Sequence, residues 1–309
     1  MGRRVAIIAI PLAGLAVAAG VLVWMDDERP PEITTIEVGT NPQEIAVGEG
    51  SVWVSGPGEV GVTEINPSSN RVEGEPVLLG TTAGGVAVGG GSVWVGAVQG
   101  SQVVRIDPEN HEVVDLIDVG DIPQQVAVGF GRVWVAVLNE GIVGRIDLDS
   151  GETSPPLITG SSFPSAVATG FGSVWVTDVV EDLLFRIDPT TGDVMARIEV
   201  GVSPTSVAVG DDSVWVADFD GELTEVDPDT NEITGKALKF EGPLGGVAVG
   251  EGSVWVTRFD ADQLVRIDPA SSRVVSLIPV GGAPAGVAVG EGSVWVANQD
   301  DATVTRVTI

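Results

Sequence analysis

Short apolar stretches alternate with small and polar residues at a regular interval along most of this chain. The clearest repeated phrase is Val-Trp-Val, and successive copies of its tryptophan are 40 or 41 residues apart. Apolar runs bounded by turn residues are typical of β-strands, and a strand-rich period near 40 residues predicts one β-propeller blade per repeat. The seven tryptophans are Trp53, Trp94, Trp134, Trp175, Trp215, Trp255 and Trp295.

Each repeat predicts four antiparallel strands. In the second repeat they cover 86–88, 93–95, 102–106 and 113–119, with Gly-rich and Asp-Pro turns between them. Every innermost strand carries an alanine, because blades converge at the axis and leave room only for small side chains. The tryptophans stand one strand further out, where the gap between sheets widens, so we predict that they are structural. The alanines are Ala46, Ala87, Ala127, Ala168, Ala208, Ala248 and Ala288.

The two ends of the repeat region predict how the ring closes. The last repeat has strands near 287–289, 294–296 and 303–309 and lacks a fourth. Residues 33–38 resemble the fourth strand of the preceding repeat, and we expect them to complete the seventh blade and remove a free edge. The predicted fold is therefore all-β: a seven-bladed β-propeller of four-stranded antiparallel blades.

The N-terminal residues form a separate element. Two arginines precede an apolar stretch over 5–25, and three acidic residues follow it. This length suits a transmembrane helix, and the basic flank places the rest of the chain outside the cytoplasm. We predict a single-pass plasma-membrane anchor over 1–25, a linker over 26–32 and an extracytoplasmic propeller over 33–309. The alternatives are a signal peptide cleaved after 16–18, giving a secreted protein, or a twin-arginine signal.

Composition narrows the chemistry. The chain has no cysteine, which excludes disulfides and thiolate catalysis, and its one histidine is His111. Its formal net charge of −29 repels nucleic acid and anionic lipid surfaces. Charged partners are therefore expected to be cations or basic surfaces.

Two phrases carry a family resemblance. Val-Ala-Val-Gly-Glu-Gly-Ser-Val-Trp-Val at 287–296, and Val-Arg-Ile-Asp-Pro at 104–108 and 265–269, resemble bacterial YVTN-type propellers and those related to streptogramin (virginiamycin B) lyase. The lyase resemblance implies magnesium-assisted opening of a cyclic peptide lactone by a catalytic histidine and a glutamate on one face. This sequence departs from that pattern, because His111 follows a turn between the two outer strands of its repeat.

The loops after the Trp phrase break the symmetry of the repeat. They are acidic in repeats 4 to 7 and nearly neutral in repeats 1 to 3, which predicts an acidic sector on one half of one face. This sector is a candidate site for Ca²⁺, Mg²⁺ or a basic partner, and a solvated surface or ordinary turn chemistry is the alternative. The candidate residues are Asp178, Glu181, Asp182, Asp218, Asp220, Asp260, Asp262, Asp300 and Asp301.

The mouth of the central channel is the second candidate. The residues that precede the inner strands are small or neutral, and Glu44 is the only charged one. Gln43, Gln124 and Gln125 could bind a small polar ligand, and Glu44 is a candidate beside them. The sequence pairs no nucleophile with a base there. We therefore predict a non-catalytic module that binds a protein, peptide or glycan through one face. The alternative is a metal-dependent lyase or lactonase.

Overall fold

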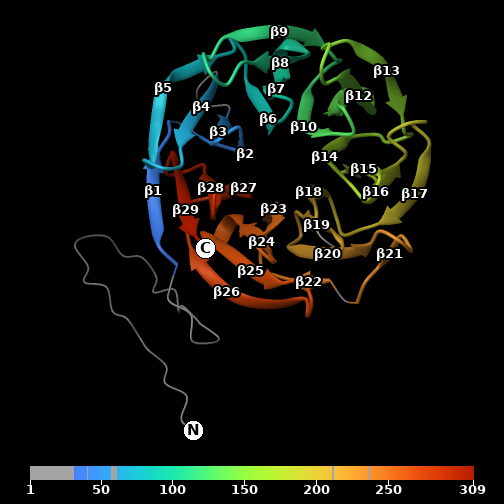
Figure 1. Ribbon diagram of the computed structural model, residues 1–309. Helices are drawn as coiled ribbons and strands as arrows, with labels where there is room; N and C mark the ends of the chain where they lie inside the picture. The colour runs from blue at the N-terminus through green and yellow to red at the C-terminus, as the bar shows by residue number, and fades with distance from the viewer. Residues whose placement is uncertain (1–30, 40, 57–60, 211, 236) are drawn as a thin grey trace.

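Seven antiparallel sheets stand radially around a central axis, one for each repeat (Figure 1). The computed structural model describes residues 31–39, 41–56, 61–210, 212–235 and 237–309. The predicted seven-bladed β-propeller is confirmed. No helix among these residues is long and apolar enough to cross a membrane. The predicted anchor over 1–25 lies outside the described residues, as does most of the linker.

The strands of blades 1 to 4 follow the chain from the axis to the rim. Blade 1 contains β2 (Glu44–Gly48), β3 (Ser51–Gly56), β4 (Gly61–Asn66) and β5 (Arg71–Leu78). Blade 2 contains β6 (Ala83–Val88), β7 (Val93–Ala97), β8 (Gln102–Ile106) and β9 (Val113–Asp118). Blade 3 contains β10 (Pro123–Gly129), β11 (Arg132–Val137), β12 (Ile142–Asp147) and β13 (Thr153–Ile158). Blade 4 contains β14 (Pro164–Gly170), β15 (Ser173–Asp178), β16 (Leu183–Ile187) and β17 (Val194–Glu199).

Blades 5 to 7 include two departures from this order. Blade 5 contains β18 (Pro204–Val209), β19 (Val214–Asp218), β20 (Glu222–Asp227) and an outer strand split into β21 (Glu232–Ile233) and β22 (Leu238–Lys239). Blade 6 contains β23 (Leu244–Gly250), β24 (Ser253–Arg258), β25 (Gln263–Asp268) and β26 (Arg273–Pro279). Blade 7 contains β27 (Pro284–Gly290), β28 (Ser293–Asn298), β29 (Thr303–Thr308) and β1 (Ile33–Glu37). Short 3-10 helices, η1 (Val98–Gly100), η2 (Leu138–Glu140) and η3 (Phe259–Ala261), follow the second strands of blades 2, 3 and 6.

Strand β1 closes the ring, as the sequence predicts. It pairs antiparallel with β29, with Ile33 opposite Val307 and Glu37 opposite Thr303. The N–H of Thr308 also donates to the carbonyl of Glu32 at 2.9 Å. The outer edge of β29 is therefore covered by the beginning of the chain (Figure 1).

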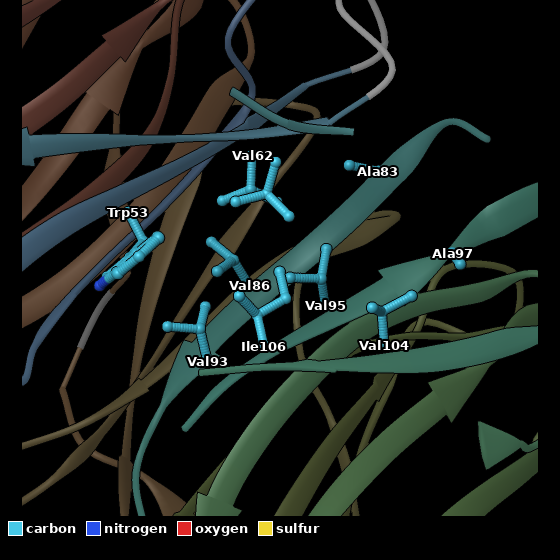
Figure 2. Close-up of a cluster of buried hydrophobic side chains, with 10 residues drawn as sticks. Trp53, Val62, Ala83, Val86, Val93, Val95, Ala97, Val104 and Ile106 are labelled. Atoms are coloured by element: carbon cyan, nitrogen blue, oxygen red, sulfur yellow. The ribbon is translucent and has the colours of Figure 1, made fainter. Parts of the chain in front are cut away.

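The tryptophans form the core between blades, as predicted. All seven are at most 2% exposed, and each lies opposite the alanine of its own inner strand. Figure 2 shows Trp53 of blade 1 beside valines of blade 2 and Ile106, which belong to one buried cluster. Close approach at the axis requires glycine, because a Cβ on Gly48 would lie 2.7 Å from Val88 of the next blade. Packing thus runs from blade to blade around the ring.

The ring has two distinct faces. Hairpin turns between the first and second strands, and between the third and fourth, form one face, which we call the turn face. The loops between the second and third strands, together with the connections between blades, form the opposite face, which we call the loop face. Since β1 pairs antiparallel with β29, residue 33 lies at the turn face and residue 37 at the loop face.

Candidate functional site

The nine acidic candidates occupy the loops between second and third strands of four consecutive blades on the loop face. Their side chains have different roles there. Asp178 and Asp218 end their strands and are buried, with exposures of 0% and 1%. The others are exposed or half-buried. What looks like one acidic cluster in the sequence is therefore two populations of carboxylates.

Asp178 ties two loops together through five hydrogen bonds. Its Oδ2 accepts from the Ser161 hydroxyl (2.6 Å) and from the backbone N–H groups of Ser162 (2.6 Å) and Phe163 (3.0 Å). Its Oδ1 accepts from the backbone N–H groups of Val180 (2.8 Å) and Glu181 (2.9 Å). Burial alone raises the pKa of Asp178, but these donors outweigh burial, so its pKa lies below the ordinary value.

Asp218 holds the same position in blade 5 but accepts fewer hydrogen bonds. Its carboxylate accepts from the N–H groups of Val202 (2.9 Å) and Glu222 (2.7 Å), with a further backbone bond from Asp220. Burial raises the pKa of Asp218 above its ordinary value, and the nearby Glu222 carboxylate adds to that rise. Glu222 in turn pairs with Lys239 at 2.9 Å.

Three more candidates fasten the connections between blades. Asp182 accepts from the N–H of Ser203 (2.8 Å), Asp262 from that of Ala283 (3.1 Å) and Asp301 from that of Gly282 (2.7 Å). The Glu181, Asp220, Asp260 and Asp300 side chains are exposed on the loop face. Glu181 also accepts from the Ser162 hydroxyl at 2.5 Å, so six of the nine candidates hold loops in place.

The described residues offer no ready metal centre. Within 31–309, apart from the positions that are not described, no three or more His, Cys, Asp or Glu side chains are arranged to hold a metal ion. In the calcium-loop-like phrase, the backbone N–H of Glu222 donates to the Asp218 carboxylate instead. The predicted Ca²⁺ or Mg²⁺ thus has no ligand set among these side chains.

The channel mouth brings two of its four candidates together. Glu44 begins β2 of blade 1, and it receives a side-chain hydrogen bond from Gln125 of blade 3. Burial raises the pKa of Glu44, and this bond opposes the rise. A Cβ on Gly85 of blade 2 would lie 2.0 Å from Gln125 Oε1, so glycine makes room for the amide. Gln43 joins the ring through its backbone carbonyl, which accepts from Gly286 at 2.8 Å, and Gln124 is exposed.

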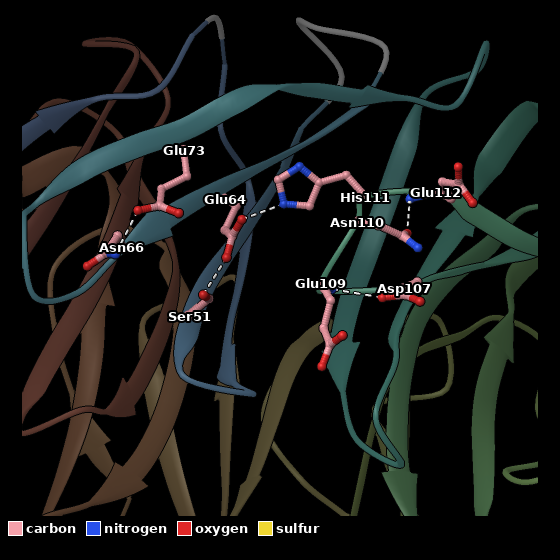
Figure 3. Close-up of polar contacts among 9 residues, drawn as sticks. All are labelled: Ser51, Glu64, Asn66, Glu73, Asp107, Glu109, Asn110, His111 and Glu112. Carbon is pink, nitrogen blue, oxygen red and sulfur yellow. Dashed lines mark hydrogen bonds and ion pairs between the residues drawn. The ribbon is translucent and has the colours of Figure 1, made fainter.

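His111 lies on the turn face, at the contact between blades 1 and 2 (Figure 3). Its Nε2 is 2.5 Å from Glu64 Oε2, and Ser51 Oγ donates to the same carboxylate. At the matching contact between blades 7 and 1, Arg306 stacks 4.9 Å from the Trp295 ring and donates to Asn70 at 2.6 Å. Glu64 and His111 therefore replace an arginine and an asparagine in a structural bridge, far from the acidic loops.

Comparison with known proteins identifies the fold. The chain is similar to a solved chain of Kuenenia stuttgartiensis hydrazine synthase, with a TM-score of 0.78 and 15% sequence identity. The similarity covers 88% of this chain and 96% of that chain. No protein-family model matches the sequence, and no curated protein matches it. At this identity the likeness establishes a shared propeller architecture.

The sequence analysis missed four exposed apolar side chains on the loop face. Phe163, Val180, Val202 and Phe219 are 39%, 61%, 50% and 60% exposed, and all belong to the loops of blades 4 and 5. The repeat itself contains the signal. Val180 stands where the next three blades carry Asp220, Asp260 and Asp300, each a further 40 residues along.

Proposed function

We propose that the protein is a non-catalytic propeller that binds a protein, peptide or glycan through its loop face. The observation that carries this proposal is the coexistence of exposed apolar side chains and exposed carboxylates on the loops of blades 4 and 5. Large apolar groups that gather outside a packed core are typical of interaction sites. The buried carboxylates beside them are engaged in holding the loops, which supports binding rather than catalysis.

We also propose that the propeller is extracytoplasmic and tethered to the plasma membrane by residues 1–25, with secretion as the alternative. The chain joins the ring at the turn face, where Glu32 accepts from Thr308. A tether attached there leaves the loop face on the opposite side of the ring. The binding face would then point away from the lipid.

We propose that the chain is related to YVTN-type and streptogramin-lyase-related propellers through its repeated scaffold sequence, and we do not extend this relationship to their activity. The resemblance rests on short phrases of the scaffold. His111 is bound to Glu64 in an inter-blade bridge on the turn face, away from the acidic loops. The proposed function therefore does not include the lyase reaction.

Site-specific cross-linking tests the proposal, and a chain without cysteine suits it. Asp260→Cys on the loop face and Glu251→Cys on the turn face, both exposed and both in blade 6, would carry the same photoactivatable group. In membranes of cells that produce the full chain, we expect a discrete cross-linked product from residue 260 and none from residue 251. Equal products from both positions, or products from residue 251 alone, would contradict the assignment of the loop face.

A further inference from the structure

The exposed apolar residues of blades 4 and 5 lie on neighbouring segments of the loop face. The carbonyl of Phe163 accepts from the N–H of Val179 at 3.2 Å, which places Phe163 beside the loop that contains Val180. In the next blade, the N–H of Val202 donates to Asp218 at 2.9 Å, beside Phe219. We call Phe163, Val180, Val202 and Phe219, with Glu181 and Glu199, the blade 4–5 patch.

Asp182 joins the part of this patch in blade 4 to the part in the connection that leads into blade 5. Its carbonyl accepts from the N–H of Val200 at 3.0 Å, and its Oδ1 accepts from the N–H of Ser203 at 2.8 Å. The loop of blade 4 is thereby fixed against the connection that leads into blade 5. The apolar side chains are consequently held on anchored backbone, so a partner would meet a preformed surface.

An open hollow lies between these two loops and is lined on its polar side by carboxylates. Its lining comprises Glu181, Asp182 and Glu199, together with Leu183, Val200 and Gly201. Glu181 and Glu199 are exposed and Asp182 is half-buried. No lysine or arginine is among the residues that line this hollow in the described chain. The hollow is therefore complementary to a positively charged group, and the exposed apolar side chains beside it are complementary to apolar groups next to that charge.

The repeat shows that two residues of the patch, Val180 and Val202, are specific to blades 4 and 5. Val202 stands where blades 6 and 7 carry Gly242 and Gly282, and Val180 stands where they carry aspartates. The apolar substitutions in the two adjacent loops flank the same acidic hollow. The scaffold does not require valine at 180 or 202, because the loops of blades 6 and 7 keep the matching backbone hydrogen bonds, from Phe259 to Pro243 and from Gln299 to Ala283, with aspartate and glycine at those two positions.

We infer that the blade 4–5 patch binds a cationic amphipathic polypeptide segment. A lysine or arginine enters the hollow between Glu181 and Glu199, and apolar side chains of the same segment cover Val180, Val202 and Phe219. Charge complementarity selects a basic segment, and the exposed rings and valines select one with apolar residues at adjacent positions. This inference rests on the proposed function and names the class of partner for it.

Peptide binding to the full chain tests the inference. The probe is a labelled synthetic dodecapeptide of four Lys-Leu-Ser repeats, measured by fluorescence anisotropy in 0.15 M NaCl, about physiological ionic strength. We expect E181K/E199K to weaken binding at least tenfold and V180S/F219S, which leaves the net charge unchanged, at least fivefold. The matched control is E251K/E291K on the turn face, which changes net charge as much as E181K/E199K and should alter affinity less than twofold. Thermal unfolding verifies that each variant is folded.

Several results would overturn the inference. Equal losses from E181K/E199K and E251K/E291K would mean attraction by overall charge alone. Unchanged affinity in V180S/F219S, or equal binding of a Lys-Ser-Ser peptide, would remove the apolar contribution. If cross-linking at residue 260 succeeds while these variants bind like the wild type, the loop face still binds a partner, a glycan or another protein, and only the cationic segment is wrong.

Discussion

Asp178 and Asp218 occupy the same position in adjacent blades, yet the pKa values of their carboxyl groups are shifted in opposite directions. Each ends the second strand of its blade and is buried. Asp178 accepts five hydrogen bonds, one of them from a hydroxyl, and its pKa is lowered. Asp218 has backbone donors only, with an acidic neighbour, and its pKa is raised. The number of donors that the surrounding loops provide decides whether the buried charge is favoured.

One substitution in the repeat accounts for much of this difference. Ser161 of the connection into blade 4 corresponds to Gly201 in the connection into blade 5. Ser161 donates its hydroxyl to Asp178, whereas a Cβ on Gly201 would lie 1.8 Å from Asp218 Oδ2. The Asp218 carboxylate thus occupies the space of the missing side chain instead of being hydrogen-bonded by it.

The largest expected effect is that of Asp178→Ala. It would leave four backbone N–H groups and one hydroxyl without their acceptor, and we expect the free energy of unfolding to fall by about 3 kcal/mol. Urea unfolding would measure this loss. Asp218→Ala is the matched control and should cost about half as much, and equal losses would contradict the difference between the two sites.

Gly201→Ala is expected to cost about 2 kcal/mol, because the new methyl group must displace the buried Asp218 carboxylate. The double variant Gly201→Ala/Asp218→Ala removes the clash and should lose less than the sum of the single variants. Additive losses in urea unfolding would show that the two side chains do not compete for the same space.

Asparagine at each position isolates the charge. We expect Asp178→Asn to lose about 1–2 kcal/mol at neutral pH, since its donors are aimed at two acceptor oxygens. Asp218→Asn should remain within about 0.5 kcal/mol of the wild type or become more stable, because it relieves a disfavoured buried charge. Asn298 already stands at this position in blade 7, where it donates to Thr303 and Thr305. A stability loss in Asp218→Asn equal to that in Asp178→Asn would contradict the opposite pKa directions.

The smallest expected effect is a change with pH in the free energy of unfolding of the wild type relative to each Asn variant. The lowered pKa of Asp178 contributes stability above its unfolded pKa, near 3.9, and this contribution is lost as pH falls through the folded pKa. The raised pKa of Asp218 acts in the other sense, so its contribution becomes less favourable as pH rises from the unfolded to the folded pKa. Urea unfolding of the wild type and both Asn variants from about pH 2.5 to 7 would measure this. We expect the stability difference between the wild type and Asp178→Asn, and that between the wild type and Asp218→Asn, to converge at the acid end.

The repeat made the scaffold predictable from the sequence, and the loops were predictable only in part. The Trp phrase, the small inner residues and the closing strand follow from local pattern and spacing, and all three are confirmed. The split of the outer strand in blade 5 was not predicted, although Gly235 with a φ of +70° stands inside it. The partners of Asp178 were missed because three of its five donors come from another loop, up to 17 residues earlier.

The bridge between Glu64 and His111 likewise could not be predicted from the sequence, because it joins two blades. The two residues are 47 positions apart, and nothing in either repeat alone indicates that they meet. Aligning the repeats shows the exchange, because Glu64 stands at the position of Arg306. Side chains that depart from the repeat thus need the ring geometry before their partners can be assigned.

The pairing of β1 with β29 also sets an order of events during folding. The strand of the propeller that is synthesised first, β1, pairs with β29, which follows it by more than 260 residues, with Ile33 opposite Val307. Closing so long a loop costs conformational entropy, although that cost grows only slowly with length. The residues of blades 1 to 6 precede β29 in the sequence, whereas the seventh blade needs both β1 and β29. The ring therefore cannot close before β29 has been synthesised, and a chain without β1 or without β29 lacks one strand of the seventh blade.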